Sequence, residues 1–272
     1  MLYVVSTPIG NLKDISLRAL EILKSVDFIL CEDTRVSKTL LNHYEIDRPL
    51  KSIHKFNEQR EIAFLVDELL KGKNAALISD AGTPLVSDPG ELLVSACIEN
   101  NIQVTPIPGA SALIAALSCS GLPVIPFQFL GFVPKKLQER RVFLFQALIY
   151  AGTSITYESP ERIVETLEKI DEIDSDRIVV IGREITKKFE TFYRDRASVI
   201  RQQLLDTPPR GEIVLLISPS DKFHNALTNV DSKNLVEYLE DKLSLDRKEA
   251  IRLAADLSLK DRRAIYKELI PD

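Results

Sequence analysis

Residues 78–90 (ISDAGTPLVSDPG) combine two aspartates with several Gly and Pro residues, which predicts a rigid, polar loop rather than a simple connection. The preceding residues 74–79 are largely apolar and predict a buried parallel strand. Asp88, Pro89 and Glu91 then predict a helix start, with Asp88 as N-cap, Pro89 at the first helical position and Glu91 closing a capping box. Ligands of open α/β sheets bind at the carboxyl ends of strands, so this stretch is a candidate binding loop. An ordinary β-to-α connection is the alternative.

Similar turns follow other predicted strands in the first 118 residues. They are 7–12 (TPIGNL), 32–35 (EDTR), 54–58 (HKFNE) and 106–112 (PIPGASA). The first of them contains one glycine, Gly10, where a Rossmann dinucleotide fingerprint needs three, so the sequence disfavours a dinucleotide site of that kind.

The second turn places Asp33 and Arg35 at a strand end, where charged side chains could contact a substrate. An N-cap role for Asp33 or Thr34 is the structural alternative. His54 also follows a predicted strand and could equally be a packed surface residue.

Strands and helices alternate from residue 2 to about residue 118, which predicts a mostly parallel, helix-covered sheet in an N-terminal α/β domain, 1–118. A proline-stiffened stretch, 121–126, leads into a second α/β domain, 119–220, in which short strands after Gly182 suggest antiparallel pairing. From about residue 221 the chain is more polar and shows helical periodicity, which predicts a helical tail domain, 221–272. The predicted fold class is therefore α/β, with two domains and a small helical tail.

The whole chain has 272 residues, 45% hydrophobic content and a net charge of −5, which indicates a globular protein without a long-range electrostatic attraction for nucleic acid. We expect neither a membrane span nor a signal peptide, and hence a cytoplasmic protein. Cys31, Cys97 and Cys119 lie in apolar runs without CxxC spacing, so we expect reduced core cysteines and no metal site.

The turns resemble one family in their order and spacing. The motifs are TPIGNL, EDTR, HKFNE, SDAGTPLVSDPG, PIPGASA, YESPERI and GREITKKFE. Together they are similar to the tetrapyrrole-methylase superfamily over residues 1 to about 220, and within it to the branch that methylates small-subunit (16S) ribosomal RNA on the ribose 2′-hydroxyl of a decoding-centre cytidine. Ala110 and Ile185 stand where many relatives carry proline and leucine, and neither difference changes a polar group.

The resemblance implies two α/β domains with S-adenosyl-L-methionine, the methyl-donor cosubstrate, in a cleft between them, and usually a homodimer. Carried onto this chain, the family's cofactor contacts are Pro8, Asp80, Gly82, Ser111 and Ala112, with Glu158 and Gly211 in the second domain. These residue types suit the ligand, because its carboxylate can be bound by backbone N–H groups and its ribose diol by an acidic or hydroxyl acceptor.

Methyl transfer to a ribose hydroxyl is an in-line displacement in which alignment can supply about 7–11 kcal/mol, whereas a general base typically adds about 10²–10⁴-fold. The candidate catalytic residues are Glu184, Lys187, Asp33 and Arg35, with His54 and Glu58 as further candidates. Glu184 and Lys187 are three residues apart in the GREITKKFE turn, where a desolvated lysine beside a carboxylate can be tuned toward neutrality. A solvated ion pair is the alternative.

The expected partner is 16S ribosomal RNA within the small ribosomal subunit. Basic residues cluster in the second domain and in the tail, and an acidic chain with only local basic clusters is expected to bind bare RNA weakly. Two other functions stay open: a tetrapyrrole (precorrin-like) methyltransferase and a non-catalytic adenosylmethionine-binding sensor.

Overall fold

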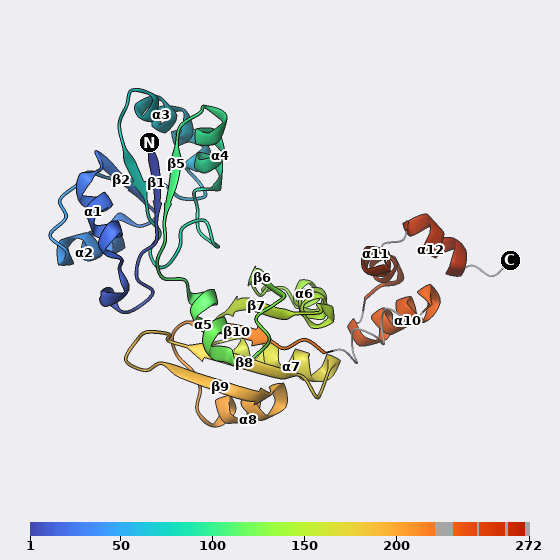
Figure 1. Ribbon diagram of the computed structural model, residues 1–272. Helices are drawn as coiled ribbons and strands as arrows, with labels where there is room; N and C mark the ends of the chain where they lie inside the picture. The colour runs from blue at the N-terminus through green and yellow to red at the C-terminus, as the bar shows by residue number, and fades with distance from the viewer. Residues whose placement is uncertain (221–230, 244, 259–260, 270–272) are drawn as a thin grey trace. The chain divides into compact units, whose positions relative to one another are not determined.

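The computed structural model describes residues 1–220, 231–243, 245–258 and 261–269 (Figure 1). Contacts divide the chain into two compact units. Unit 1 comprises Met1–Ala115 together with Glu184–Glu190, and unit 2 comprises Ala116–Arg183 and Thr191–Asp272. The sequence-based division at residues 118 and 220 stays a prediction. No helix among the described residues is long and apolar enough to cross a membrane.

Unit 1 is built on a five-stranded sheet of order β3-β2-β4-β1-β5. Its strands are Leu2–Val5 (β1), Phe28–Cys31 (β2), Leu50–Ser52 (β3), Ala75–Leu77 (β4) and Val104–Ile107 (β5). Every pairing in this sheet is parallel, which confirms the prediction. The connecting helices are Leu12–Asp14 (η1, a 3-10 turn), Leu17–Ser25 (α1), Thr34–His43 (α2), Glu58–Leu70 (α3) and Glu91–Glu99 (α4).

Helices cover both faces of this sheet. Successive side chains of each strand point to opposite faces, so β1, β2, β4 and β5 each contribute to two apolar clusters. In β2, Phe28 and Leu30 pack with α3 and α4, while Ile29 and Cys31 pack with α1 and α2. Figure 1 shows α1 and α2 on one side of the sheet and α3 and α4 on the other. The carboxyl ends of the strands are left as the edge from which the polar turns project.

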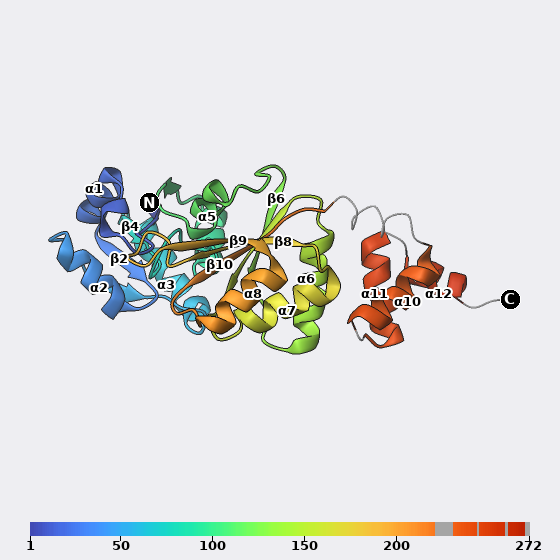
Figure 2. The same cartoon turned by 90° about the horizontal axis from the view of Figure 1, so that it is seen from below.

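Unit 2 is built on a second five-stranded sheet, of order β6-β7-β10-β8-β9. Its strands are Phe127–Phe132 (β6), Thr153–Glu158 (β7), Ile178–Arg183 (β8), Thr191–Arg196 (β9) and Ile213–Ile217 (β10). Within this sheet only β6 and β7 are parallel, and the antiparallel pairing predicted after Gly182 is confirmed. Its helices are Leu137–Ile149 (α6), Ile163–Ile173 (α7) and Ala197–Asp206 (α8), which lie side by side along the sheet in Figure 2, while Ala112–Ser120 (α5) spans the boundary of the units.

The predicted helical tail is present as Ser232–Leu243 (α10), Arg247–Ser258 (α11) and Arg262–Leu269 (α12). Leu235 and Leu239 of α10 belong to the same apolar cluster as Leu144 and Phe145 of α6. The Arg141 guanidinium of α6 also donates to the Leu243 carbonyl at 3.3 Å. The tail therefore contributes to the core of unit 2.

The predicted N-terminus of α4 is wrong. The helix begins at Glu91 with Gly90, at φ +122°, as its N-cap, and no side chain of its own segment caps it. The carboxylate of Glu58, at the start of α3, accepts from the Leu93 N–H at 3.0 Å instead. A residue distant in sequence thus provides a hydrogen-bond acceptor for the first turn of α4, the role that was expected of Asp88 and Glu91.

Cys31 and Cys97 are buried and free, as expected, whereas Cys119 is exposed, so its assignment to the core is wrong. Leu113, Ala116, Leu117 and Ser120 form the buried stripe of α5, and Cys119 lies outside it.

Candidate functional site

The turns after β1 and β4 are joined directly at the carboxyl edge of the unit 1 sheet. The Thr7 N–H donates to the Gly82 carbonyl at 2.8 Å, and the Gly82 N–H donates back to the Thr7 carbonyl at 3.1 Å. Thr7 and Gly82 thus form an isolated antiparallel bridge, which joins the turns that follow the parallel strands β1 and β4. This bridge fixes the start of the SDAGTP loop against the TPIGNL turn.

Hydroxyl groups extend this connection to the turn after β5. Ser6 Oγ lies 3.0 Å from Thr83 Oγ1, and Thr83 Oγ1 lies 3.1 Å from the Ala110 carbonyl, to which it donates. Thr7 Oγ1 donates to the Ser79 carbonyl at 3.3 Å. Sequence reasoning did not single out these hydroxyl residues, although each lies within a few residues of a strand end.

Glycine is required where these turns approach one another. Gly82 is buried at φ +82°, and a Cβ there would lie 3.3 Å from Ile9 Cγ2. A Cβ on Gly109 would lie 2.9 Å from Ser6 Cβ, closer than side chains pack. Pro8, a sequence-predicted contact, is buried between Thr7 and Ile9 and restricts the backbone of the first turn.

Ser111 and Ala112 stand where α5 begins, directly after the turn that follows β5. Both are partly buried, and the Ser111 carbonyl accepts from the Ala115 N–H at 2.9 Å. The N–H groups in the first turn of a helix have no partners within the helix, so this position can bind an anionic group such as a carboxylate.

Asp80 presents an exposed carboxylate in the SDAGTP loop. Its Oδ1 accepts from the Asp33 N–H at 3.2 Å, which joins the loop after β4 to the turn after β2. The structure thus brings together the turns of four strands, β1, β2, β4 and β5, at one edge. Of the sequence-predicted cofactor contacts, Pro8, Asp80, Gly82, Ser111 and Ala112 all belong to this cluster of turns.

Asp33 is the N-cap of α2, as the structural alternative held, and its carboxylate accepts from the Arg35 N–H at 2.8 Å. The same carboxylate pairs with the exposed Arg35 guanidinium at 2.6 Å. Hydrogen bonding to the Arg35 side chain lowers the pKa of Asp33 to about 2. A carboxylate of such low basicity is a poor proton acceptor near neutral pH, so Asp33 is a weak candidate for a general base.

Asp88, expected as a helix cap, is instead partly buried in the loop that leads to α4. Burial raises the pKa of Asp88 to about 6. The negative charges of Glu32 and Asp80 raise it further, while a hydrogen bond from Ser79 and the positive charge of Lys55 oppose the shift. The carboxyl edge of the sheet therefore carries a group that titrates just below neutral pH.

We expect Asp88→Asn to stabilise the protein at pH 8. The pKa of Asp88 is raised from 3.8 to about 6 in the folded state, so the folded chain binds the proton more tightly than the unfolded chain does. The contribution of Asp88 to stability is thus complete below about pH 4 and is lost as the pH rises through about 6. Because water screens this half-exposed group, the gain at pH 8 should be at most about 1 kcal/mol, or about 2–4 °C in Tm.

Thermal unfolding of the wild type and Asp88→Asn between pH 4 and pH 8 measures this effect. Asp47→Asn, which removes an exposed carboxylate from the same unit, is the matched control. A Tm difference between wild type and Asp88→Asn that is the same at pH 4 and pH 8 would contradict the assignment.

The loop Glu184–Glu190, between β8 and β9, belongs to unit 1 by its contacts. Asn11 donates its N–H to Thr186 Oγ1 at 3.1 Å, which ties the loop to the TPIGNL turn. A Cβ on Gly10 would lie 2.4 Å from Lys187 Cγ and 3.2 Å from the Ile185 carbonyl oxygen. Gly10 therefore permits a close approach between the first turn and the loop. This packing explains the glycine, and no dinucleotide-binding motif is needed to account for it.

Within this loop Lys187 Nζ lies 2.8 Å from Glu184 Oε1, and both side chains are partly exposed, Lys187 at 29% and Glu184 at 19%. The backbone of Glu184 (φ +51°) and of Thr186 (φ +67°) adopts the left-handed conformation. That conformation is unfavourable for threonine, and such strain is concentrated at functional sites. The structure thus places the two sequence-predicted residues as an ion pair in a strained loop beside Gly10.

His54 and Glu58, the further candidates, have structural contacts. Glu58 is buried and binds the N-terminus of α4 through the Leu93 N–H, so it is not available to a substrate. His54 accepts from the Phe56 N–H through Nδ1 at 3.3 Å and shapes the turn that follows β3.

In unit 2, the Glu158 side chain is fully buried and its carboxylate is used within the fold. It pairs with Arg162 at 2.7 Å and accepts from the Ser159 N–H and the Thr166 hydroxyl, each at 2.7 Å. This carboxylate secures the start of α7, so any cofactor contact at this position would come from its backbone.

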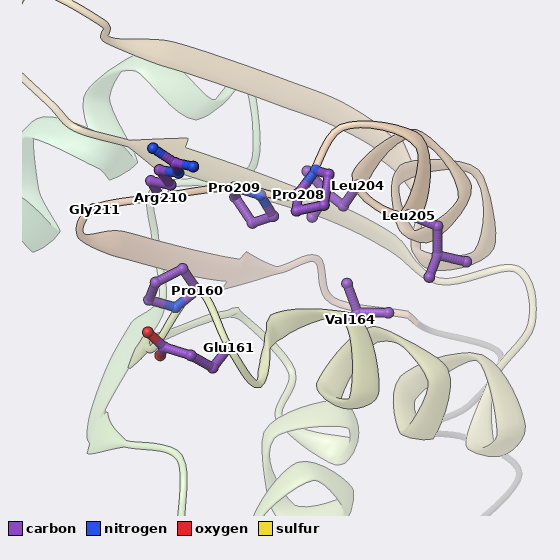
Figure 3. Close-up of a pocket in the computed structure, with 9 residues that line it drawn as sticks. All are labelled: Pro160, Glu161, Val164, Leu204, Leu205, Pro208, Pro209, Arg210 and Gly211. Carbon is purple, nitrogen blue, oxygen red and sulfur yellow. The ribbon is translucent and has the colours of Figure 1, made fainter.

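Gly211 is exposed, at φ +87°, just before β10. It lines a hollow of about 480 Å³ in unit 2 together with Pro160, Glu161, Val164, Leu204, Leu205, Pro208, Pro209 and Arg210. Figure 3 shows Arg210 and Glu161 toward one end and Leu204, Leu205 and Val164 toward the other. Its volume falls within the range of about 300–1,000 Å³ typical of small-molecule pockets.

Among the described residues, no group of three or more His, Cys, Asp or Glu side chains is arranged to hold a metal ion.

Comparisons with known proteins agree with the resemblance drawn from the turns. The family model of the tetrapyrrole (corrin/porphyrin) methylases matches residues 1–200. The chain is 43% identical over 269 residues to the ribosomal RNA small subunit methyltransferase I of Pasteurella multocida, covering 98% of this chain and 95% of the relative. It is 40% identical over 269 residues to the enzyme of the same name from Streptococcus pyogenes, covering 98% and 93%.

Solved structures share the fold at low sequence identity. A diphthine synthase is 15% identical with a TM-score of 0.60, covering 83% of this chain and 93% of the other. The uroporphyrin-III-C-methyltransferase of Thermus thermophilus is 16% identical with a TM-score of 0.55, covering 82% and 95%. The two-sheet architecture, the joined strand-end turns and the sequence matches lead to one conclusion: the chain belongs to the tetrapyrrole methylase family.

Proposed function

We propose that the protein transfers a methyl group from S-adenosyl-L-methionine to the 16S ribosomal RNA of the small ribosomal subunit, on the ribose 2′-hydroxyl of a decoding-centre cytidine. The observation that carries the proposal is the identity of about 40% over nearly the whole chain to enzymes named ribosomal RNA small subunit methyltransferase I. The turns of unit 1 support it, because they place polar groups that can bind a small ligand at the carboxyl ends of the strands, where the methyl donor would be held.

The residues at this edge fit an adenosylmethionine-like molecule. The exposed carboxylate of Asp80 can accept hydrogen bonds from a ribose diol. The N-terminus of α5, at Ser111 and Ala112, can receive a carboxylate. Gly82, at φ +82° and with Ile9 packed where a Cβ would lie, lets the two bridged turns pack closely and so fixes the loop that carries Asp80. When bound, S-adenosylmethionine would supply the electrophilic methyl group.

The residues of the Glu184–Glu190 loop would serve the acceptor hydroxyl. During transfer, a new C–O bond forms at the 2′-oxygen, the methyl carbon leaves the sulfonium sulfur, and the hydroxyl proton passes to a base. Lys187 would accept that proton as the neutral amine, and the Glu184 carboxylate 2.8 Å away would stabilise the ammonium group that forms. Asp33 is the weaker candidate, because its pKa is lowered to about 2. Arg35 remains a candidate for orienting a phosphate.

The working form is proposed to be a homodimer in the cytoplasm, an inference that rests on the family resemblance. The exposed basic side chains of the tail are proposed to contact ribosomal RNA. They include Arg247, Lys248, Arg252, Arg262 and Arg263, and Lys260 of the same cluster lies outside the described residues. Because α10 and α11 are part of the unit 2 core, charge reversal of these residues tests that role better than deletion of the tail would.

The experiment is incubation with adenosylmethionine labelled in the methyl group and one of three acceptors: small ribosomal subunits, a short free RNA containing the decoding-centre sequence, or a tetrapyrrole. We expect label in the 16S RNA of the particles, at a 2′-O-methylcytidine after nuclease digestion, and much less in the short RNA, because an acidic chain with only local basic clusters releases few counterions from RNA.

Label in the tetrapyrrole alone would assign the protein to small-molecule methylation. Binding of adenosylmethionine without transfer to any acceptor would indicate a sensor. Efficient methylation of the short RNA would remove the requirement for the particle.

A further inference from the structure

Phe56 has a highly exposed aromatic ring at the carboxyl edge of the unit 1 sheet. Its relative exposure is 98%, the highest among the large hydrophobic residues that the structure describes as exposed. It lies in the HKFNE turn after β3, which is an outermost strand of the sheet. Because all strands of this sheet are parallel, the HKFNE turn and the SDAGTP loop both project from the carboxyl ends of the strands.

The turn around Phe56 is held by hydrogen bonds and carries one lysine, Lys55. The Phe56 N–H donates to His54 Nδ1 at 3.3 Å, and the two rings pack edge to face with centroids 6.1 Å apart. Asn57 Oδ1 accepts from the His54 N–H at 2.8 Å. The end of β3 is joined to the turn after β2, because Ser52 Oγ donates to the Glu32 carbonyl at 3.0 Å. The ring is therefore held in solvent by a structured turn beside the candidate site.

A second exposed ring lies at the same edge. Phe189 is 64% exposed, in the Glu184–Glu190 loop of unit 1, and Lys188 Nζ lies 5.5 Å from its ring centroid. The Asn11 N–H donates to Thr186 Oγ1 and so fixes this loop beside the turn after β1, while the Thr186 N–H donates to Glu190 within the loop. β1 and β3 are three strands apart in the sheet, or about 14 Å at the usual strand spacing.

We propose that Phe56 and Phe189 are stacking platforms for unpaired bases of the ribosomal RNA on either side of the methylated nucleotide. The inference rests on the proposed function and names how its substrate is held. Exposed aromatic faces with adjacent cations are the features by which proteins bind splayed single-stranded bases: the ring stacks on the base and the cation contacts the neighbouring phosphate.

A lysine beside each ring favours RNA as the occupant, since the glutamates of the same turns are used within the fold: Glu58 is buried and Glu190 accepts from the Thr186 N–H. The chain as a whole is acidic, at −5, yet each of the two rings is preceded directly by lysine: Lys55 before Phe56 and Lys188 before Phe189. The rings also lie at separated points of the edge, which suits successive bases of an extended strand, whereas a protein partner would favour one contiguous apolar patch.

The kinetic test measures KM and kcat for small ribosomal subunits as substrate. We expect Phe56→Ala to raise KM about tenfold with little change in kcat, since one base–aromatic stack is worth about that factor in binding. Phe189→Ala should have a similar effect. Phe56→Tyr, which retains a stacking ring, should restore KM, whereas Phe56→Leu, which retains only apolar surface, should not.

Ile98→Ala is the matched control. Ile98 is also strongly exposed, at 63%, but it lies in the last turn of α4, before the amino end of β5 and hence at the opposite edge of the sheet. The affinity of each variant for adenosylmethionine, measured by calorimetry, should equal that of the wild type.

A direct test uses the absence of tryptophan from the chain. Phe56→Trp introduces a single tryptophan, whose fluorescence should be quenched when small ribosomal subunits are added, because stacking on a nucleobase quenches indole. Ile98→Trp corrects for light absorbed by the particles and should show no further quenching.

The failures of the two proposals are distinguishable. If the wild type does not methylate small-subunit RNA, the proposed function is wrong. If the wild type is active but Phe56→Ala and Phe189→Ala keep the wild-type KM, or Phe56→Leu restores it, then stacking at these rings is overturned. Fluorescence of the Phe56→Trp variant that is quenched no more than that of the Ile98→Trp control would overturn it as well.

Discussion

Replacing Lys187 by alanine should slow methyl transfer about 10²–10⁴-fold, the range expected for loss of a general base. The structure places Lys187 Nζ 2.8 Å from Glu184 Oε1 in a strained loop that packs on Gly10, beside the cluster of strand-end turns. Because the residue would act on the acceptor hydroxyl, the loss should fall on kcat, and affinity for adenosylmethionine should stay within about twofold. Single-turnover transfer to small ribosomal subunits and calorimetry measure the two quantities.

Lys169→Ala is the matched control, because Lys169 also pairs with a glutamate three residues away, Glu172, at 2.5 Å, on helix α7. It should leave kcat unchanged. Glu184→Gln keeps the size of the side chain and removes its charge, so it should produce a smaller loss than Lys187→Ala if Glu184 only orients the lysine. A normal kcat for Lys187→Ala would contradict the role of Lys187 as a base, and the rate would then come mainly from alignment of the methyl donor with the acceptor hydroxyl.

The central strands β1, β2 and β4 of unit 1 could be predicted closely from the sequence because each is a short, continuous apolar run. Such runs are typical of strands that are buried on both faces, and the alternation of Ile29 and Leu30 between the two cores shows that burial. In unit 2, α8 was not predicted. Its residues 197–206 follow β9 with no capping side chain, so the sequence carries no local signal for the helix start.

Helix caps were predictable only where the capping residue is local. Asp33 caps α2 by accepting from the N–H of Arg35, two residues later, and the sequence suggests this cap. At α4 the helix is reached through Leu85 (φ +72°), Ser87 (φ +76°) and Gly90 (φ +122°), and Glu58 of another helix binds its first turn. The loop is therefore determined by packing between distant segments, which a spacing rule for Asp88 and Glu91 does not contain.

The candidate site shows the same limit. Sequence reasoning identified the turns because each follows a strand, and parallel strands end at one edge. It did not identify how the turns are joined, since the Thr7–Gly82 bridge and the Ser6–Thr83 contact link residues more than 70 positions apart. Nor did it predict that the loop Glu184–Glu190, which connects two strands of unit 2, packs with unit 1.

Gly82→Val should lower affinity for adenosylmethionine by at least about 100-fold, or about 2.8 kcal/mol. Gly82 is buried at φ +82°, a conformation that valine does not tolerate, and its Cβ would lie 3.3 Å from Ile9 Cγ2 before the two branches are added. Relief of that conflict would break the two hydrogen bonds with Thr7 and move the SDAGTP loop. Calorimetry with adenosylmethionine measures the loss, and circular dichroism shows whether the variant is folded.

Gly72→Val separates backbone strain from loss of the site. Gly72 also has a positive φ, +91°, but a Cβ there meets nothing within 4 Å, and the residue lies at the end of α3, ahead of the amino end of β4. Both variants should lose about 1 kcal/mol or more of stability through the backbone. Only Gly82→Val should lose affinity for the donor, and Gly82→Ala should fall between Gly82→Val and the wild type. A folded Gly82→Val protein that binds adenosylmethionine as tightly as Gly72→Val does would remove Gly82, and with it the Thr7–Gly82 bridge, from the binding site.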